Sequence, residues 1–176
     1  MDIYLIRHTS VDVPPGICYG QTDVPLKSSF EQEAALVKEQ LTTHVFDAVY
    51  TSPLSRCVRL ATYCGYPNAQ RDHRLKEMYM GDWEMQAFDT INDPQLQEWY
   101  DNYLHVPTRN GESYQDLFAR VSSFFQELKD HSNHKKIAVF AHGGVLLSAQ
   151  IYAGVLNPTN ALQKLPSYGE IVWITL

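Results

Sequence analysis

The sequence predicts an α/β protein of three layers, in which helices cover both faces of a mainly parallel sheet. Short apolar segments alternate along the chain with segments of helical periodicity, as in the strand–helix units that build such a sheet. Residues 137–141 are apolar at every position, which is typical of a strand buried on both faces. Residues 48–51 favour a strand and are followed at once by Ser52-Pro53, a helix-start signal.

Each predicted element has its own local signal. Strands are expected where a short run is rich in apolar and β-branched residues, at 2–7, 48–51, 137–141 and 170–175. Helices are expected where apolar residues recur every three or four positions, at 30–43, 53–64, 93–104, 112–129 and 144–154. Ser52 is predicted to cap the second helix, with Pro53 at its first position. Residues 71–92 have no regular pattern and are predicted to be mostly loop.

Composition points to one domain spanning residues 1–176 and argues against several functions. The net charge of −6, with no basic stripe, argues against a nucleic-acid partner. The apolar run at 3–6 is too short for a signal peptide or a membrane span. Three sparse cysteines fit a reducing cytoplasm better than a disulfide framework. The last strand carries Trp173 and could form a sheet edge, which leaves a dimer open.

Basic side chains gather where the predicted strands end. Arg7 and His8 end the first strand, and His142 follows the strand at 137–141. Arg56 lies in the first turn of the helix after strand 48–51, where its side chain leans back toward the strand end. Because ligands of open α/β sheets bind at the carboxyl ends of the strands, we expect these four side chains to share one site.

This residue set suits phosphoryl transfer. A neutral imidazole is a competent nucleophile, and arginine guanidinium groups bind phosphate oxygens in bidentate fashion. The leaving alkoxide needs a proton from a general acid. Glu77 is the first candidate for that acid, with Asp82 and Glu84 as competitors in the same predicted loop.

Four motifs resemble those of the histidine phosphatase superfamily, which includes the cofactor-dependent phosphoglycerate mutases. They are residues 5–8, 51–57, 75–77 and 141–144. The resemblance implies a phosphoglycerate mutase-like fold and phosphate binding by Arg7, Arg56 and His142. It also implies that His8 is the nucleophile, that Glu77 is the acid and then the base, and that no metal or cofactor takes part.

Within the superfamily, segments 18–26, 77–85 and 107–113 resemble the alpha-ribazole-5′-phosphate phosphatases of the cobalamin pathway. The substrate would then be a small phosphate ester, hydrolysed through a phosphohistidine. Its contacts are expected at Tyr19, Gly20, Gln21 and Gly143, since they lie near the predicted catalytic strand ends.

Two alternatives remain open at this point. One is another enzyme of the superfamily, a sugar- or nucleotide-phosphate phosphatase or a mutase-like enzyme. The other is a phospho-ligand-binding module with impaired catalysis, because Thr9 and Ser10 replace the Gly-Glu that usually follows the Arg-His pair.

Overall fold

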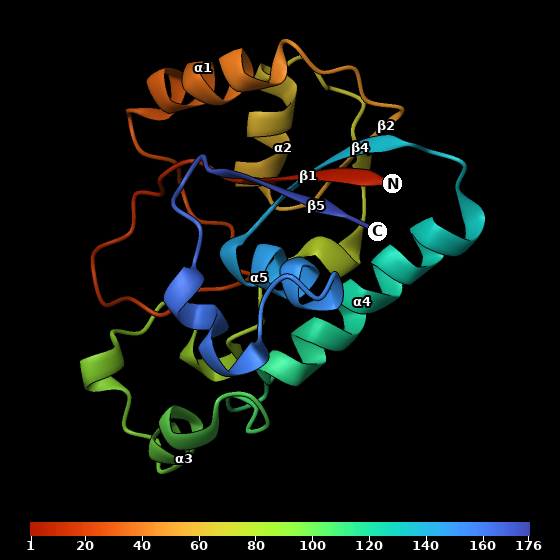
Figure 1. The fold of residues 1–176 in the computed structure, drawn as a ribbon. Helices are drawn as coiled ribbons and strands as arrows, with labels where there is room; N and C mark the ends of the chain where they lie inside the picture. Colours follow the sequence, from red (N-terminus) through yellow and green to blue (C-terminus); the bar gives the residue numbers. More distant parts are fainter.

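A computed structural model describes residues 1–159 and 161–176, and it contains the mainly parallel sheet that the sequence predicts (Figure 1). In the described residues the sheet has the strand order β3-β2-β4-β1-β5. The strands are β1 (Asp2–Arg7), β2 (Ala48–Thr51), β3 (Gln70–Arg71), β4 (Lys136–Ala141) and β5 (Ile171–Thr175). All neighbours pair in parallel except β5, which runs antiparallel to β1.

Helices cover both faces of this sheet, and the alternation of side chains along β4 explains why. Ala138 and Phe140 belong to one apolar cluster, while Ile137 and Val139 belong to the other. Helices α1 (Phe30–Leu41) and α2 (Ser55–Tyr63) cover the first face; α4 (Tyr114–His131) and α5 (Gly143–Tyr152) cover the second. The predicted three-layer α/β fold is confirmed.

The predicted start of the second helix is wrong. Helix α2 begins at Ser55 after Leu54, and Ser52 does not cap it. Instead the carboxylate of Asp23 accepts hydrogen bonds from the amide and the hydroxyl of Ser55, at 3.0 and 2.7 Å. A cap supplied by a residue 32 positions earlier leaves no local signal. The Ser52 hydroxyl accepts a hydrogen bond from the amide of Leu54, at 3.3 Å, before the helix begins.

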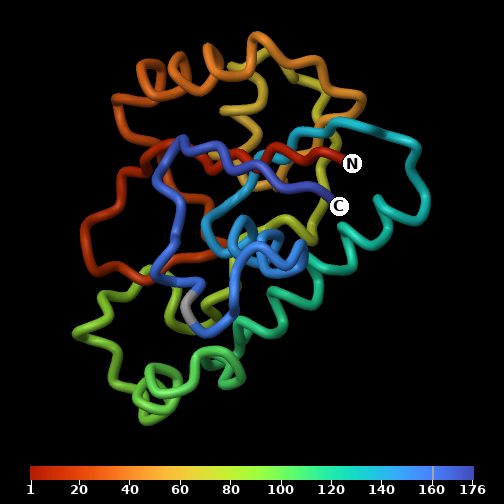
Figure 2. The backbone as a smooth tube through the Cα atoms, in the orientation of Figure 1, coloured from red at the N-terminus to blue at the C-terminus, as the bar shows by residue number. Residues whose placement is uncertain are grey.

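Several short elements were not predicted. They are β3, the 3₁₀ turns η1 (His73–Leu75), η2 (Gly81–Trp83) and η3 (Phe88–Thr90), and the longer η4 (Pro158–Lys164). Helix α3 (Gln95–Asn102) lies within the predicted segment 93–104 but has no fully buried residue. Figure 2 shows its segment, in green, set away from the sheet.

The two chain ends meet at the end of the sheet where β1 begins and β5 finishes. The amino group of Met1 donates a 2.7 Å hydrogen bond to the carbonyl of Leu176, and Figures 1 and 2 show the termini side by side. Strand β5 is an edge strand, as expected, and Trp173 on it is 58% exposed. Among the described residues, no helix combines the length and apolarity needed to cross a membrane.

Candidate active site

The structure brings the four basic residues together at the carboxyl end of the sheet. Arg7 ends β1 beside Ala141 of β4, so His8 and His142 leave neighbouring parallel strands at the same edge. Their ring centroids are 5.2 Å apart. Arg56, in the first turn of α2, donates from Nε to Nδ1 of His142 at 3.3 Å. The topology therefore creates the cluster that the sequence could only propose.

His8 is held in its neutral form. Its Nδ1 lies 2.8 Å from the carbonyl oxygen of Thr9, which can only accept, so Nδ1 carries the proton and Nε2 keeps its lone pair. Burial, followed by the positive charge of Arg56, lowers the pKa of His8 from 6.5 to about 3. Thr9 contributes its backbone carbonyl to this contact, while its buried hydroxyl has no hydrogen-bond partner among the described residues.

His142 lies fully buried behind Arg56. Because its Nδ1 accepts from Arg56, its Nε2 carries the proton and donates to the hydroxyl of Ser52 at 2.8 Å. Burial and the charge of Arg56 hold the pKa of His142 well below its usual range. His142 is not among the cavity-lining residues, so in this arrangement it orients Arg56.

Arg56 is tied to the turn that contains two of the predicted substrate contacts. Its terminal nitrogens donate to the carbonyls of Gly20, at 2.6 Å, and Thr22, at 2.9 Å. A Cβ on Gly20 would lie 1.8 Å from the carbonyl oxygen of Met78, so only glycine fits there. Three of the five guanidinium hydrogens are used in these bonds and the one to His142, which leaves two for a ligand.

Arg7 keeps a donor free. Its Nε is buried and has no hydrogen-bond partner in the part of the chain that the structure describes, while one terminal nitrogen donates to the carbonyl of Pro166. A buried N–H group without a partner is costly unless a ligand supplies an acceptor. Arg7 therefore fits the role of an oxyanion ligand beside His8.

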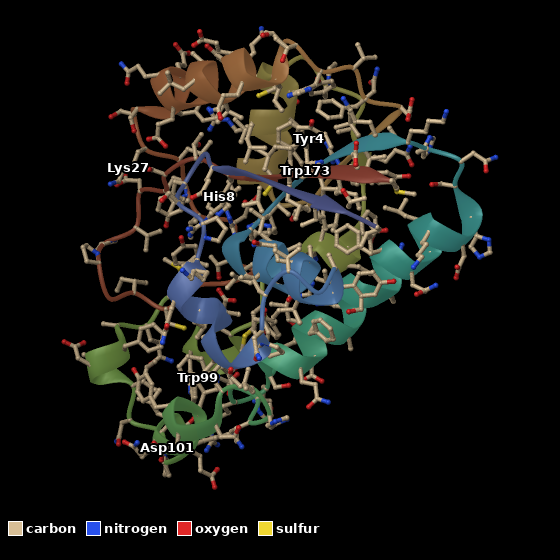
Figure 3. All side chains as sticks on the ribbon, in the orientation of Figure 1. Tyr4, His8, Lys27, Trp99, Asp101 and Trp173 are labelled. Atoms are coloured by element: carbon tan, nitrogen blue, oxygen red, sulfur yellow. The ribbon has the colours of Figure 1, made fainter. Side chains whose placement is uncertain are left out.

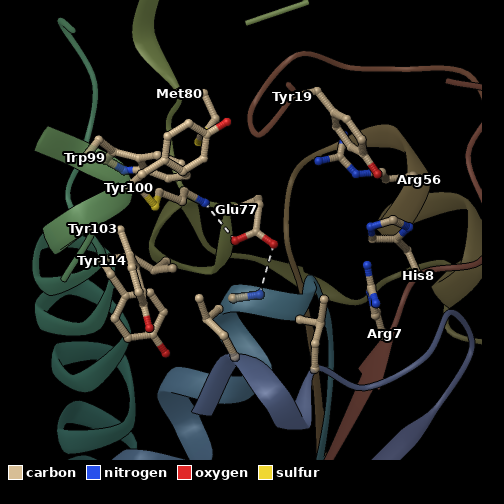
Figure 4. A pocket seen from close by; sticks show the side chains of 15 residues that line it. Arg7, His8, Tyr19, Arg56, Glu77, Met80, Trp99, Tyr100, Tyr103 and Tyr114 are labelled. Atoms are coloured by element: carbon tan, nitrogen blue, oxygen red, sulfur yellow. Dashed lines mark hydrogen bonds between the residues drawn. The ribbon is translucent and has the colours of Figure 1, made fainter. Parts of the chain in front are cut away.

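These residues open onto a cavity of about 540 Å³ (Figure 4). Glu77 projects into its middle, between the group of Arg7, His8 and Arg56 and a group of aromatic side chains. Its carboxylate accepts hydrogen bonds from the amides of Met78, at 2.8 Å, and Gly144, at 3.0 Å. A Cβ on Gly144 would meet Glu77 at 2.4 Å, so this glycine admits the carboxylate to the start of α5.

The two competing carboxylates lie elsewhere. Asp82 is exposed, accepts from the side chain of Asn110 at 2.8 Å and lines a different cavity. Glu84 accepts from the amides of Gly20, Gln21 and Thr22 and holds their turn in place. Burial acts to raise the pKa of Glu84, but these bonds and one from the Thr22 hydroxyl outweigh it and leave the pKa below its ordinary value. Of the three carboxylates, Glu77 alone lines the cavity with His8.

The predicted substrate contacts divide into two groups. Tyr19 lines the cavity, and its ring lies 5.7 Å from the Arg56 guanidinium carbon. Gly20, Gln21 and Gly143 do not line it. The Gln21 side chain donates to the carbonyl of Glu77 at 3.0 Å, and Gly143 lies under Arg7 and Leu165, so both act on neighbours of the cavity.

In the far half of the cavity, the contributions of α3 and η4 were not predicted. Helix α3 and the residue after it supply Trp99, Tyr100 and Tyr103, α4 supplies Tyr114, and η4 supplies Leu162. Figure 3 shows Trp99 well away from the sheet edge that carries His8. The one signal in the sequence for this half was the group of aromatic residues in the predicted helix at 93–104, which has few other apolar residues. In the described residues no group of three or more His, Cys, Asp or Glu side chains forms a metal site.

The fold and this site together define a phosphatase of the histidine type, and comparison with known proteins agrees. Residues 3–175 match the family model of the histidine phosphatase superfamily (branch 1). The chain belongs to that superfamily and is an enzyme of the phosphoric monoester hydrolase class.

Individual relatives differ in their named activities. Adenosylcobalamin/alpha-ribazole phosphatase of Escherichia coli is 29% identical over 154 residues, covering 83% of this chain and 75% of that protein. Phosphoserine phosphatase 1 of Hydrogenobacter thermophilus is 22% identical over 147 residues, covering 80% and 70%. The crystal structure of the alpha-ribazole phosphatase from Shigella flexneri shares the fold, with a TM-score of 0.89 at 23% identity over 100% of this chain and 91% of that one.

Proposed function

We propose that this protein hydrolyses a small phosphate monoester through a phosphohistidine on His8, with alpha-ribazole 5′-phosphate as the preferred substrate. The observation that carries the mechanism is the state of His8, which is neutral, has its Nε2 free and faces a cavity with two arginines. In keeping with its three unpaired buried cysteines, we place the protein in the cytoplasm, as one histidine phosphatase domain.

In the first step, Nε2 of His8 attacks phosphorus and the P–O bond to the leaving group breaks. Arg7 and Arg56 bind the equatorial oxygens, where the transferring phosphoryl group carries its charge. Glu77 in its acid form gives its proton to the leaving oxygen, so the alcohol departs neutral.

In the second step, water attacks the phosphohistidine. The Glu77 carboxylate takes a proton from the water, the P–N bond breaks and its electron pair returns to Nε2 of His8. Inorganic phosphate leaves, and the enzyme is restored. The backbone bonds to Glu77 from Met78 and Gly144 keep its carboxyl at one place for both steps.

The neutral aromatic half of the cavity supports the choice of substrate. Apart from Arg7, His8, Arg56 and Glu77, the lining residues carry no ionisable group other than tyrosine hydroxyls. Such a surface suits a flat, uncharged group attached to the phosphate, as in a riboside of an aromatic base. A second anionic group, such as the carboxylate of phosphoserine, would find no cation there.

The mechanism is tested by rapid quench with phosphate-labelled substrate and no added metal. We expect an acid-labile phosphoenzyme in the wild type and none in His8→Ala, with turnover reduced by at least about 10³-fold. Full activity of His8→Ala, or a wild type that turns over without phosphoenzyme, would falsify the covalent mechanism.

Steady-state turnover of a set of phosphate esters separates the alternatives. The specificity constant for alpha-ribazole 5′-phosphate should exceed those for phosphoserine, phosphoglycerate and simple sugar phosphates. Preference for one of the latter would assign the protein to another branch of the superfamily. A protein that binds these esters without releasing phosphate would be the impaired module, although the backbone of Thr9 preserves the orientation of His8.

A further inference from the structure

One short segment before β5, Pro166–Gly169, contacts the Arg7–His8 pair from the solvent side. The carbonyl of Pro166 accepts from the Arg7 guanidinium, and the amide of Gly169 donates to the carbonyl of His8 at 3.1 Å. Gly169 has φ +71°, a conformation that glycine adopts without strain and that lets the segment turn into β5. The chain therefore closes over the strand end that carries the proposed nucleophile.

Tyr168 is the side chain of this segment that faces the site. Its ring lies 4.2 Å from the guanidinium carbon of Arg7, close enough for a cation–π interaction. The same ring lies 5.5 Å from the ring of His8. Because Nε of Arg7 has no hydrogen-bond partner among the described residues, this aromatic face and the Pro166 carbonyl are the contacts that fix the guanidinium.

The hydroxyl of Tyr168 makes a second link. It lies 3.0 Å from the hydroxyl of Tyr19, a residue 149 positions away. Tyr19 in turn lies over Arg56, at 5.7 Å from the guanidinium carbon. Each phosphate-site arginine thus has one tyrosine ring beside it, and the two tyrosines meet at their hydroxyls on the outer side of His8.

We propose that Tyr168 is a positioning residue of the phosphate site: its ring holds the Arg7 guanidinium beside His8, and its hydroxyl joins Tyr19 to close the outer side of the site. The role assigned to Tyr168 rests on the proposed function of His8 and deepens it.

The ring is tested by binding of inorganic phosphate, measured by calorimetry on the whole chain. Tyr168→Leu removes the aromatic face, so we expect the dissociation constant for phosphate to rise about tenfold. Tyr168→Trp restores an aromatic face and should bind phosphate within about twofold of the wild type. Tyr79→Phe is the matched control, since Tyr79 is 41% exposed, as against 40% for Tyr168, and lines no part of the cavity.

The hydroxyl pair is tested by a double-mutant cycle on kcat/KM with Tyr19→Phe, Tyr168→Phe and the double variant. If the pair acts as a unit, the two single changes have equal effects and the double change adds nothing further. Independent, additive effects overturn the link. These phenylalanine variants keep the ring volumes, so they report on the link even if Tyr168→Leu does not fold.

Failure of this proposal is distinct from failure of the proposed function. Phosphate affinity in Tyr168→Leu that stays within about twofold of the wild type overturns the role of Tyr168, even where the phosphoenzyme forms normally. A purely structural role would lower the melting temperature and leave phosphate affinity unchanged. Absence of a phosphoenzyme in the wild type overturns the chemistry at His8 and leaves the phosphate-binding result standing.

Discussion

The two halves of the cavity are built in different ways. The phosphate half, with Arg7, His8 and Arg56, comes from strand ends and the first turn of a helix packed on the sheet. Each of its side chains has its own hydrogen bonds: Arg7 to Pro166, His8 to Thr9, and Arg56 to His142 and Gly20. The aromatic half comes largely from α3, which has no fully buried residue, and from η4. In Figure 4 the two groups face each other across Glu77.

This difference separates chemistry from selectivity. Phosphoryl transfer needs hydrogen-bond donors in fixed positions, because a displaced guanidinium no longer stabilises the charge on the phosphoryl oxygens in the transition state. Recognition of a leaving group needs area and shape, which a helix attached by aromatic contacts can supply and which substitutions can alter without disturbing the sheet. Changes in the first half should therefore affect every substrate, and changes in the second only some.

After the loss of His8 itself, the largest effect is expected at the boundary between the two halves, from Glu77→Gln. Loss of the acid should lower kcat/KM, which reports the first step, by about 10²- to 10³-fold for esters with poor leaving groups. It should lower kcat/KM by less than about tenfold for activated aryl esters, because their leaving groups depart unprotonated. Asp82→Asn is the control, since Asp82 is exposed and lines another cavity. Values of kcat/KM across a leaving-group series measure the difference, and an equal fall in kcat/KM for all esters would remove Glu77 from the role of acid.

A smaller, selective effect is expected from Tyr100→Ala in the aromatic half. Tyr100 lines the cavity and is 51% exposed, so its removal leaves the fold in place. We expect kcat/KM to fall about tenfold for a ribosyl phosphate bearing an aromatic base and to stay unchanged for glycerol phosphate. Loss of activity on both esters alike would contradict the division of the cavity into two halves.

The phosphate half could be predicted because its signals are local. Apolar runs mark β1 and β4, and Arg7, His8 and His142 stand at their ends, so a rule about parallel sheets suffices to bring them together. The register of β1 against β4 then places His8 beside His142 without any further information from the sequence.

The rest could not be predicted because it depends on contacts between distant segments. Asp23 caps α2 from 32 positions away, and the Glu77 carboxylate meets the amide of Gly144 across 67. Neither pairing has a periodicity or a spacing that a single sequence displays. The aromatic half is similar, because whether Trp99 faces solvent, core or cavity is decided by where α3 docks.

The last expected difference between the two halves concerns the effect of low pH on stability. His8 lines the phosphate half and His142 lies buried behind Arg56, and both have lowered pKa values, whereas the lining of the aromatic half contains no histidine. Below pH 6.5 the unfolded chain binds protons at these two positions, but the folded chain does not, since the pKa of folded His8 is about 3. The stabilisation that depends on these two neutral histidines should therefore be fully present above pH 6.5, and the free energy of unfolding should fall as the pH drops below it.

Urea unfolding between pH 5 and pH 7.5 measures this loss above the range in which most carboxylates titrate. Each of the two histidines can contribute up to about 1.4 kcal/mol per pH unit to the slope, so His8→Asn should remove up to half of it. An unchanged slope in His8→Asn would mean that the folded protein protonates His8 as readily as the unfolded chain does. The proposal that His8 is a neutral nucleophile would then fail. The contrast between a phosphate half that keeps its histidine unprotonated and an aromatic half without histidine would fail with it.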